Sequence, residues 1–410
     1  MTKSSPILLV AYGGGHVAML APIFRALKAS GYPVTFLALT TAGKFLDNLN
    51  IPYIGYKDLP GANDADAQAY GRQLASAIPP GGPVPESETI AYLGLNYREL
   101  VKLHGAGRAE SLYAEKGRQA FLPAGLFESW FMELKPSLVI ATNSPRSEQA
   151  AILAAKKKGI PAICAIDLFG LQEIQWIGNP GYANKICVLN EDVRQMLLKK
   201  GRKPEEVVVT GNPAFERINS VEAHAAGIAL RKSRNWNDEL KTILWASQIE
   251  PVQHPFAPRR GDPELPRRIE NQLRNFVSHH KGFRLVVRYH PSEQVCFREG
   301  QDRVELSPRD EDLAALLHAV DTVVVTSSTV GLEAYIAGRQ VISVDCSIFT
   351  DDAPYSRMGI ASGVSKVENL DELLLTAPVR NSGDKEDLHQ KTSATQKILE
   401  TAKQLIRNEI

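Results

Sequence analysis

The chain has few cysteines, almost no net charge and no long apolar run, and each of these features excludes a class of function. Its four cysteines lie far apart and form no CxxC pair, which argues against a zinc site or a thioredoxin-like motif. Lys and Arg number 47 against 46 Asp and Glu, so the chain has no overall field that would hold a nucleic acid. We therefore expect no nucleic-acid partner.

The sequence also shows no signal-like or membrane-spanning segment. Its first apolar stretch, Ile7 to Ala11, runs into glycines and is too short for either. We expect a cytoplasmic protein. Attachment at the inner face of the membrane stays open, because a surface helix can provide it without a long apolar run.

The sequence does contain a regular alternation of short β-rich runs with helix-length segments, which is typical of parallel sheets covered by helices. Its 410 residues exceed one ordinary core, so we expect two domains. The expected strands of the first domain are Ile7 to Ala11, Val34 to Leu39, Leu138 to Ala141, Ala162 to Ile166, Lys185 to Leu189 and Val207 to Val209. Those of the second are Thr242 to Trp245, Arg284 to Arg288, Thr322 to Val325 and Val341 to Val344.

The breaks in this alternation predict the domain limits. We expect an N-terminal domain over residues 1–218 and a C-terminal domain over 219–384, each doubly wound and Rossmann-like. A helical insertion over about 61–122 interrupts the first and either shapes an acceptor pocket or forms a plain lid. A last helix within 385–410 is expected to pack back on the N-terminal domain.

A glycine-rich turn ends the first expected strand, and a helix is expected to begin near Met19. Gly14 and Gly15 let the backbone turn tightly and present amide groups to anionic or sugar oxygens. The run does not match the dinucleotide pattern, which disfavours a nicotinamide dehydrogenase. His16 follows directly, and an imidazole there either takes a proton from an acceptor hydroxyl or only bonds the backbone or donor.

Two further motifs follow strands of the second domain. His290 with the rigid Pro291 ends one strand, and the hydroxyl run Ser327, Ser328, Thr329 opens a helix after another. Hydroxyls and a helix N-terminus can donate to phosphate oxygens, although they can equally serve as helix caps. We interpret the two motifs together as a nucleotide-phosphate site.

The stretch Gly15 to Pro22 resembles the opening of GT-B glycosyltransferases, and Gly211-Asn212-Pro213 resembles the turn that ends their first domain. The resemblance implies a GT-B α/β fold with two domains facing each other across a cleft, and a histidine base at His16. The His-Pro and Ser-Ser motifs resemble those of bacterial sialyltransferases, polysialyltransferases and Kdo transferases, which use CMP-sugars. In those families the histidine and the serines contact the CMP phosphate.

Three other residues are assigned by position. Asp167 at a strand end is a rival base, or else a turn-forming aspartate. Ser247, after the first strand of the second domain, is expected to face the phosphate, or to be a simple strand end. Glu333, on the helix after the hydroxyl run, is expected to bind the ribose.

We therefore expect a glycosyltransferase that moves a sugar from a nucleotide-activated donor to a glycan or glycolipid acceptor in surface polysaccharide synthesis. A CMP-sugar, such as one of Kdo or a sialic-type acid, is the preferred donor, and a UDP-sugar is the alternative. No cofactor and no bound metal are expected, because a helix dipole and hydrogen-bond donors can neutralise the leaving phosphate. One alternative is an enzyme like the hydrolysing UDP-GlcNAc 2-epimerases. The other is a non-catalytic GT-B module of a polysaccharide assembly complex.

Overall fold

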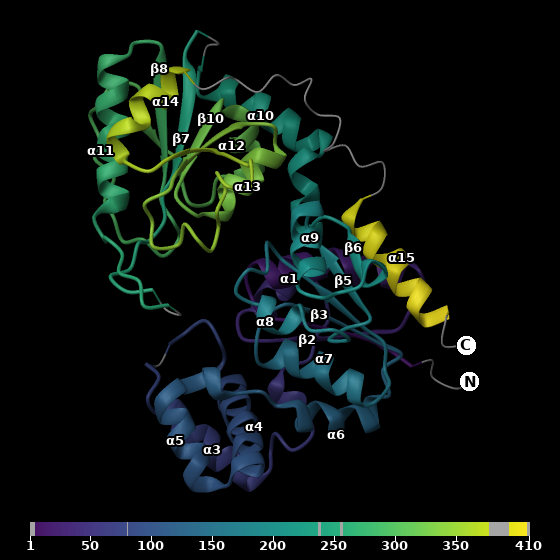
Figure 1. Cartoon of the computed structure of the whole chain (residues 1–410). Helices are drawn as coiled ribbons and strands as arrows, with labels where there is room; N and C mark the ends of the chain where they lie inside the picture. Colours follow the sequence, from purple (N-terminus) through teal and green to yellow (C-terminus); the bar gives the residue numbers. More distant parts are fainter. Residues whose placement is uncertain (1–4, 80, 237–238, 255–256, 377–392, 408–410) are drawn as a thin grey trace. The chain divides into compact units, whose positions relative to one another are not determined.

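The computed structural model describes residues 5–79, 81–236, 239–254, 257–376 and 393–407 (Figure 1). The chain divides into two compact units, Met1–Ala214 with Thr392–Ile410, and Phe215–Lys391. Residues 385–392 and 408–410 of the expected last helix lie outside the described residues. No described helix is both long and apolar enough to span a bilayer.

Unit 1 is built on a six-stranded parallel sheet with the order β2-β1-β3-β4-β5-β6. Leu9 of β1 lies opposite Phe36 of β2 and Ile140 of β3, and all three are buried. These strands are continuously apolar because their side chains are buried on both faces of the sheet. The strands are β1 (Ile7–Ala11), β2 (Val34–Ala38), β3 (Leu138–Thr142), β4 (Ala162–Ala165), β5 (Lys185–Val188) and β6 (Val207–Val209).

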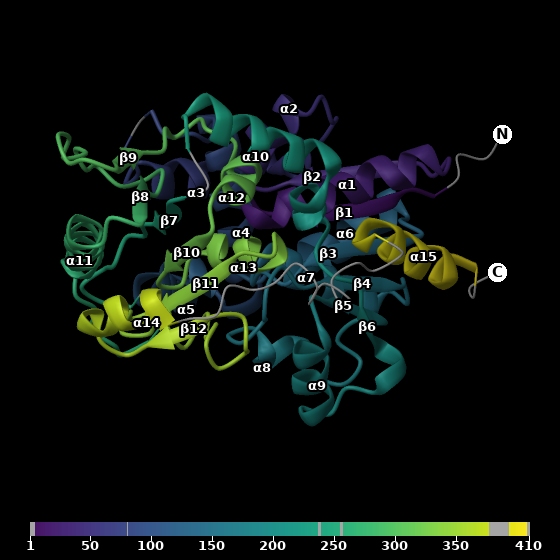
Figure 2. The ribbon, with the colours of Figure 1, turned by 90° about the horizontal axis from the view of Figure 1, so that it is seen from above.

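Helices α1 (Gly15–Ala29) and α15 (Ala394–Arg407) lie side by side on this sheet (Figure 2). Ile398, Leu399 and Ala402 of α15 belong to the same buried core as Val17 of α1 and the strands. The last described helix thus closes the core of unit 1. The other helices beside this sheet are α2 (Ala42–Asn48), α6 (Ala124–Leu134), α7 (Ser147–Lys157), α8 (Ile174–Ile177) and α9 (Glu191–Lys199).

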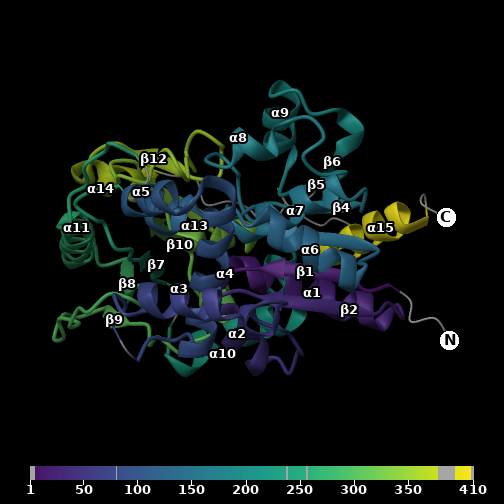
Figure 3. The same ribbon diagram turned by 90° about the horizontal axis from the view of Figure 1, so that it is seen from below.

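The insertion between β2 and β3 contains three longer helices, α3 (Ala65–Ala75), α4 (Glu86–His104) and α5 (Ala106–Lys116). Helix α3 packs closely on α4 (Figure 3). Glycine permits this approach, since a Cβ on Gly94 would lie 1.9 Å from the carbonyl oxygen of Ala67. Arg98 of α4 pairs with Asp64 and Asp66 at 2.7 and 3.3 Å. These ion pairs give the two aspartates at the start of α3 a structural role.

Unit 2 contains a second six-stranded parallel sheet with the order β12-β11-β10-β7-β8-β9. Helices α11 and α14 cover one face, and α10, α12 and α13 lie on the other (Figure 1). The strands are β7 (Lys241–Ala246), β8 (Phe283–Arg288), β9 (Val304–Leu306), β10 (Thr322–Val325), β11 (Gln340–Val344) and β12 (Ser362–Val364). The helices are α10 (Val221–Ser233), α11 (Leu265–His279), α12 (Leu313–Ala319), α13 (Thr329–Ile336) and α14 (Leu370–Thr376).

Two all-parallel sheets, each covered by helices, confirm the prediction of an α/β fold with two Rossmann-like halves. The edge strands β9 and β12 were not predicted, because each has only three residues and their partly exposed patterns give little apolar signal.

Candidate functional site

The first candidate site lies at the carboxyl end of the unit 1 sheet, where β1 meets α1. A Cβ on Gly13 would lie 1.8 Å from Thr41 Oγ1, and Gly14 has a φ of 70°, so both positions require glycine. Apart from the adjoining residues and the backbone of α1, no heavy atom of the described residues lies within 4 Å of the place of a Cβ on Gly14 or Gly15. The helix starts at Gly15, one turn before the expected start near Met19, so His16 stands in its first turn and not in the loop.

His16 and Asp167, which the sequence presents as rival bases, lie together. Their closest atoms, His16 Nε2 and Asp167 Oδ2, are 3.8 Å apart, and each side chain is roughly one fifth exposed, at 21% and 23%. His16 Nε2 also lies 3.1 Å from the hydroxyl of Ser144. One imidazole, one carboxylate and one hydroxyl thus share the edge at which β1, β3 and β4 end.

The residues that follow β3 also belong to this site, and the sequence did not predict them. Asn143 Oδ1 accepts a hydrogen bond from the Asp167 amide at 3.0 Å, which fixes the Asp167 loop. Glu148, in the first turn of α7, is fully buried. Its Oε1 atom accepts hydrogen bonds from the Tyr12 amide at 3.0 Å and from the Thr142 hydroxyl. The signal that was available is a polar run, Thr142 to Glu148, directly after a buried strand.

Two further carboxyl groups, Glu148 and Glu173, interact electrostatically with His16. Burial raises the pKa of Glu148, and the charge of His16 opposes that rise. Burial likewise raises the pKa of Glu173, in the loop before α8, and His16 again lowers it, while Asp167 raises it. Groups whose protonation states influence one another in this way are suited to moving a proton near neutral pH.

A cavity of about 650 Å³ lies beside this site within unit 1. It is lined mainly by the helical insertion and by Thr40 at the end of β2, and its size is that of a small-molecule pocket. Tyr92, which also lines it, lies with its hydroxyl 3.2 Å from the hydroxyl of Tyr12, just before the glycine turn. Tyr56 and Ser147 extend this buried contact, with their hydroxyls 2.7 Å apart.

The second candidate site lies at the carboxyl end of the unit 2 sheet. His290 is exposed after β8, and its Nδ1 atom accepts a hydrogen bond from the Ser292 amide at 3.2 Å. The neutral ring therefore carries its proton on Nε2, which makes that nitrogen a donor. The His290 amide donates to Glu293 Oε2 at 2.7 Å, so the Glu293 carboxylate closes the turn that contains Pro291.

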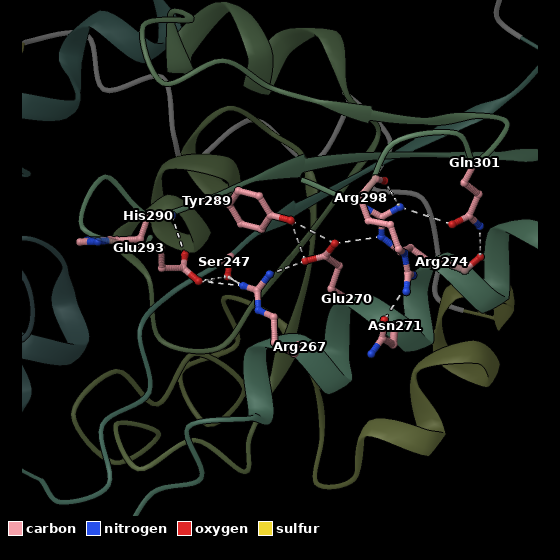
Figure 4. Close-up of polar contacts among 10 residues, drawn as sticks. All are labelled: Ser247, Arg267, Glu270, Asn271, Arg274, Tyr289, His290, Glu293, Arg298 and Gln301. Atoms are coloured by element: carbon pink, nitrogen blue, oxygen red, sulfur yellow. Dashed lines mark hydrogen bonds and ion pairs between the residues drawn. The ribbon is translucent and has the colours of Figure 1, made fainter. Parts of the chain in front are cut away.

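Glu293 belongs to a buried polar network that supports this turn (Figure 4). Its Oε1 atom accepts hydrogen bonds from Ser247 at 3.0 Å and from Arg267 at 2.7 Å. Arg267 also pairs with Glu270, which in turn binds Arg274 at 2.8 Å. Ser247 is 4% exposed and donates its hydroxyl proton to Glu293, while its contact with a phosphate stays a prediction. Its contacts make it a support for the His290 turn.

The hydroxyl run stands at the start of α13. Ser328 is the N-cap, and its Oγ accepts a hydrogen bond from the Val330 amide at 3.3 Å. Ser327 Oγ accepts from Gln248 Nε2 at 2.9 Å, and Thr329 is exposed at the first helical position. Each serine oxygen acts as an acceptor here, so its hydroxyl proton stays available to another acceptor such as a phosphate oxygen.

Glu333 lies one turn further along α13. Burial raises the pKa of Glu333 to about 7, although Thr329 and the Arg288 guanidinium oppose the rise. At neutral pH this carboxyl is therefore close to half protonated and can accept or donate a hydrogen bond.

We expect the stability of the protein to report the Glu333 pKa. A carboxyl whose folded pKa exceeds its unfolded value of 4.5 stabilises the fold below pH 4.5, and this contribution is lost as the pH rises toward about 7. After allowance for partial exposure, the loss is about 2 to 3 kcal/mol. Urea unfolding of the wild type and of Glu333→Gln at pH 5 and pH 8 measures it, and parallel pH dependences of the two proteins would refute the assignment.

Comparison with solved structures identifies the fold. The structure is similar to the UDP-GlcNAc 2-epimerases from Neisseria meningitidis and Methanocaldococcus jannaschii, with a TM-score of 0.58 to each and identities of 15% and 13%. The matches cover 97% of this chain in both cases, and 100% and 99% of those proteins. The calicheamicin glycosyltransferase CalG4 matches with a TM-score of 0.56 and 11% identity, over 98% of this chain and 99% of that protein.

Neither family models nor curated protein sequences give a match. At these identities the solved structures establish the fold alone, which is the GT-B fold of nucleotide-sugar epimerases and glycosyltransferases. The fold part of the sequence-based resemblance is thereby confirmed.

Proposed function

We propose that this protein is a metal-independent glycosyltransferase that transfers a sugar from a nucleotide-activated donor to a glycan or glycolipid acceptor. One observation above all supports the proposal: each unit carries polar groups at the carboxyl end of its parallel sheet, the edge at which α/β folds bind ligands. The unit 1 group is suited to proton transfer. The unit 2 group is suited to holding a phosphate.

In unit 2, the donor phosphate would accept hydrogen bonds from Ser327, Ser328 and His290 Nε2. The N-terminus of α13 would add its favourable dipole. Thr329 extends the same hydroxyl run, and Glu333 would contact the ribose. These groups stabilise the negative charge that develops on the leaving nucleotide, which is the main requirement of glycosyl transfer without a metal.

In unit 1, His16 would take the proton from the acceptor hydroxyl as the new glycosidic bond forms. Asp167, 3.8 Å from the imidazole, would stabilise the imidazolium that results. Gly14 and Gly15 would leave room for sugar oxygens at the start of α1. The cavity lined by the helical insertion would hold part of the acceptor.

The identity of the donor nucleotide is a finer part of the proposal. We favour a CMP-sugar, of the Kdo or sialic-acid type, because the His-Pro and Ser-Ser motifs resemble those of enzymes that use such donors. A role in surface polysaccharide synthesis, at the inner face of the membrane, belongs to the same proposal.

A hydrolysing UDP-GlcNAc 2-epimerase is the second candidate, favoured by the structural similarity to solved enzymes of that name. The carboxyl groups around His16 would also suit proton abstraction from a sugar carbon. The two functions predict different products when no acceptor is added. The epimerase would convert UDP-GlcNAc to UDP and free epimerised sugar, whereas the transferase would leave UDP-GlcNAc intact. NMR of UDP-GlcNAc incubated with the protein alone decides between them, and accumulation of the free epimer would overturn our preferred function.

A further inference from the structure

Glu148 is a fully buried carboxyl group, and within the residues that the structure describes only one of its two oxygens has hydrogen-bond donors. Its Oε1 atom has two donors, but the buried Oε2 atom has no hydrogen-bond partner of good geometry among the described residues. An unpartnered oxygen on a buried carboxyl costs free energy, and such groups are rare without a functional reason.

His16 has a matching feature. Its Nδ1 atom is buried and has no hydrogen-bond partner in the described parts of the chain, while Nε2 lies 3.1 Å from Ser144 Oγ. The His16 ring and the Ser144 hydroxyl both lower the pKa of Glu148, which places both side chains beside this carboxyl. Ser144 thus stands next to the base on one side and next to the buried carboxyl on the other.

We propose that Glu148 is the positioning residue of His16, and that the Ser144 hydroxyl links the buried carboxyl to the imidazole. The assignment rests on the proposed function, in which His16 is the base. Glu148 would not touch the substrate, because it is fully buried. It would hold a negative charge close to the ring when His16 takes the acceptor's proton, and would thereby stabilise the imidazolium.

The other titratable neighbours of Glu148 do not supply a negative charge to the His16 ring. Burial raises the pKa of Tyr12, Cys164 and Tyr182, so these neighbours of Glu148 stay neutral at physiological pH. On the side of His16 the described residues include two charged groups, Asp167 and Glu173, and both lie in the region that follows β4. The experiment must therefore separate Glu148 from Asp167.

The test is the pKa of His16 in the full chain, measured by NMR of protein labelled with ¹³C-histidine and assigned with the His16→Gln variant. In Glu148→Gln the pKa of His16 should fall by about one unit, because the variant loses an anion beside the imidazolium. The acidic limb of the pH profile of turnover should move to lower pH by the same amount. Glu128→Gln is the matched control. It neutralises a carboxylate of α6 that pairs with Lys157, at the end of the helix that contains Glu148, and it should leave the pKa of His16 unchanged.

An unchanged His16 pKa in Glu148→Gln would overturn the proposal, as would a fall seen in Asp167→Asn alone. Should Glu148→Gln fail to fold, Ser144→Ala decides instead: the proposal requires a lower His16 pKa, and an unchanged value rejects it. The NMR measurement needs no substrate. A shifted pKa in a protein without transfer activity would therefore reject the proposed function and leave the role of Glu148 in place.

Discussion

Replacing His16 by alanine should lower turnover by about 100- to 10,000-fold, which is the usual contribution of a positioned general base. The affinity for the nucleotide should stay nearly unchanged. The base acts on the acceptor during transfer, and the proposed phosphate ligands all belong to unit 2. Steady-state kinetics with calorimetric nucleotide titration of the same variant measures both quantities.

Asp167→Asn is the control for this assignment, because it removes the charge next to His16 with little change in volume. It should lower turnover less than His16→Ala, since Asp167 only stabilises the imidazolium in our account. Abolished turnover in Asp167→Asn, with most activity kept in His16→Ala, would show that the aspartate is the base.

The double substitution Ser327→Ala with Ser328→Ala should weaken nucleotide binding by about 10- to 150-fold. Loss of a hydrogen bond to a charged group costs about 1.5 to 3 kcal/mol, which corresponds to this range. A stability loss of about 1 kcal/mol should accompany it, because Ser328 also caps α13.

Ser220→Ala provides a matched control for the double variant. Ser220 caps α10 in the same manner, with its hydroxyl accepting from the Ala223 amide at 3.1 Å. This variant should lose a similar stability and keep its nucleotide affinity. Equal nucleotide affinities in wild type and double variant would mean that Ser327 and Ser328 are only structural.

The fold was largely predictable because its signal is local. Buried parallel strands are continuous apolar runs, and each was found within a residue or two, except the three-residue edges β9 and β12. The start of α1 was missed because glycines are poor helix formers, so the pattern appeared to begin at Met19.

The site was predictable only in part, because its contacts join residues far apart in the chain. His16 and Ser144 are 128 residues apart and meet through the strand order β1-β3-β4, which no local pattern encodes. The same holds for Ser247, whose partner Glu293 lies 46 residues further on. Residue type suggested a phosphate ligand at Ser247, which stays a prediction, and only the three-dimensional structure shows its hydrogen bond to Glu293.

The most direct test of the central claim, that unit 2 binds the nucleotide of an activated sugar, is a calorimetric titration of the full chain with CMP and with UDP. We expect saturable binding of one nucleotide per chain, with CMP bound more tightly than UDP. Tight binding of UDP with none of CMP would overturn the donor assignment. Binding of neither nucleotide would contradict the proposed function itself.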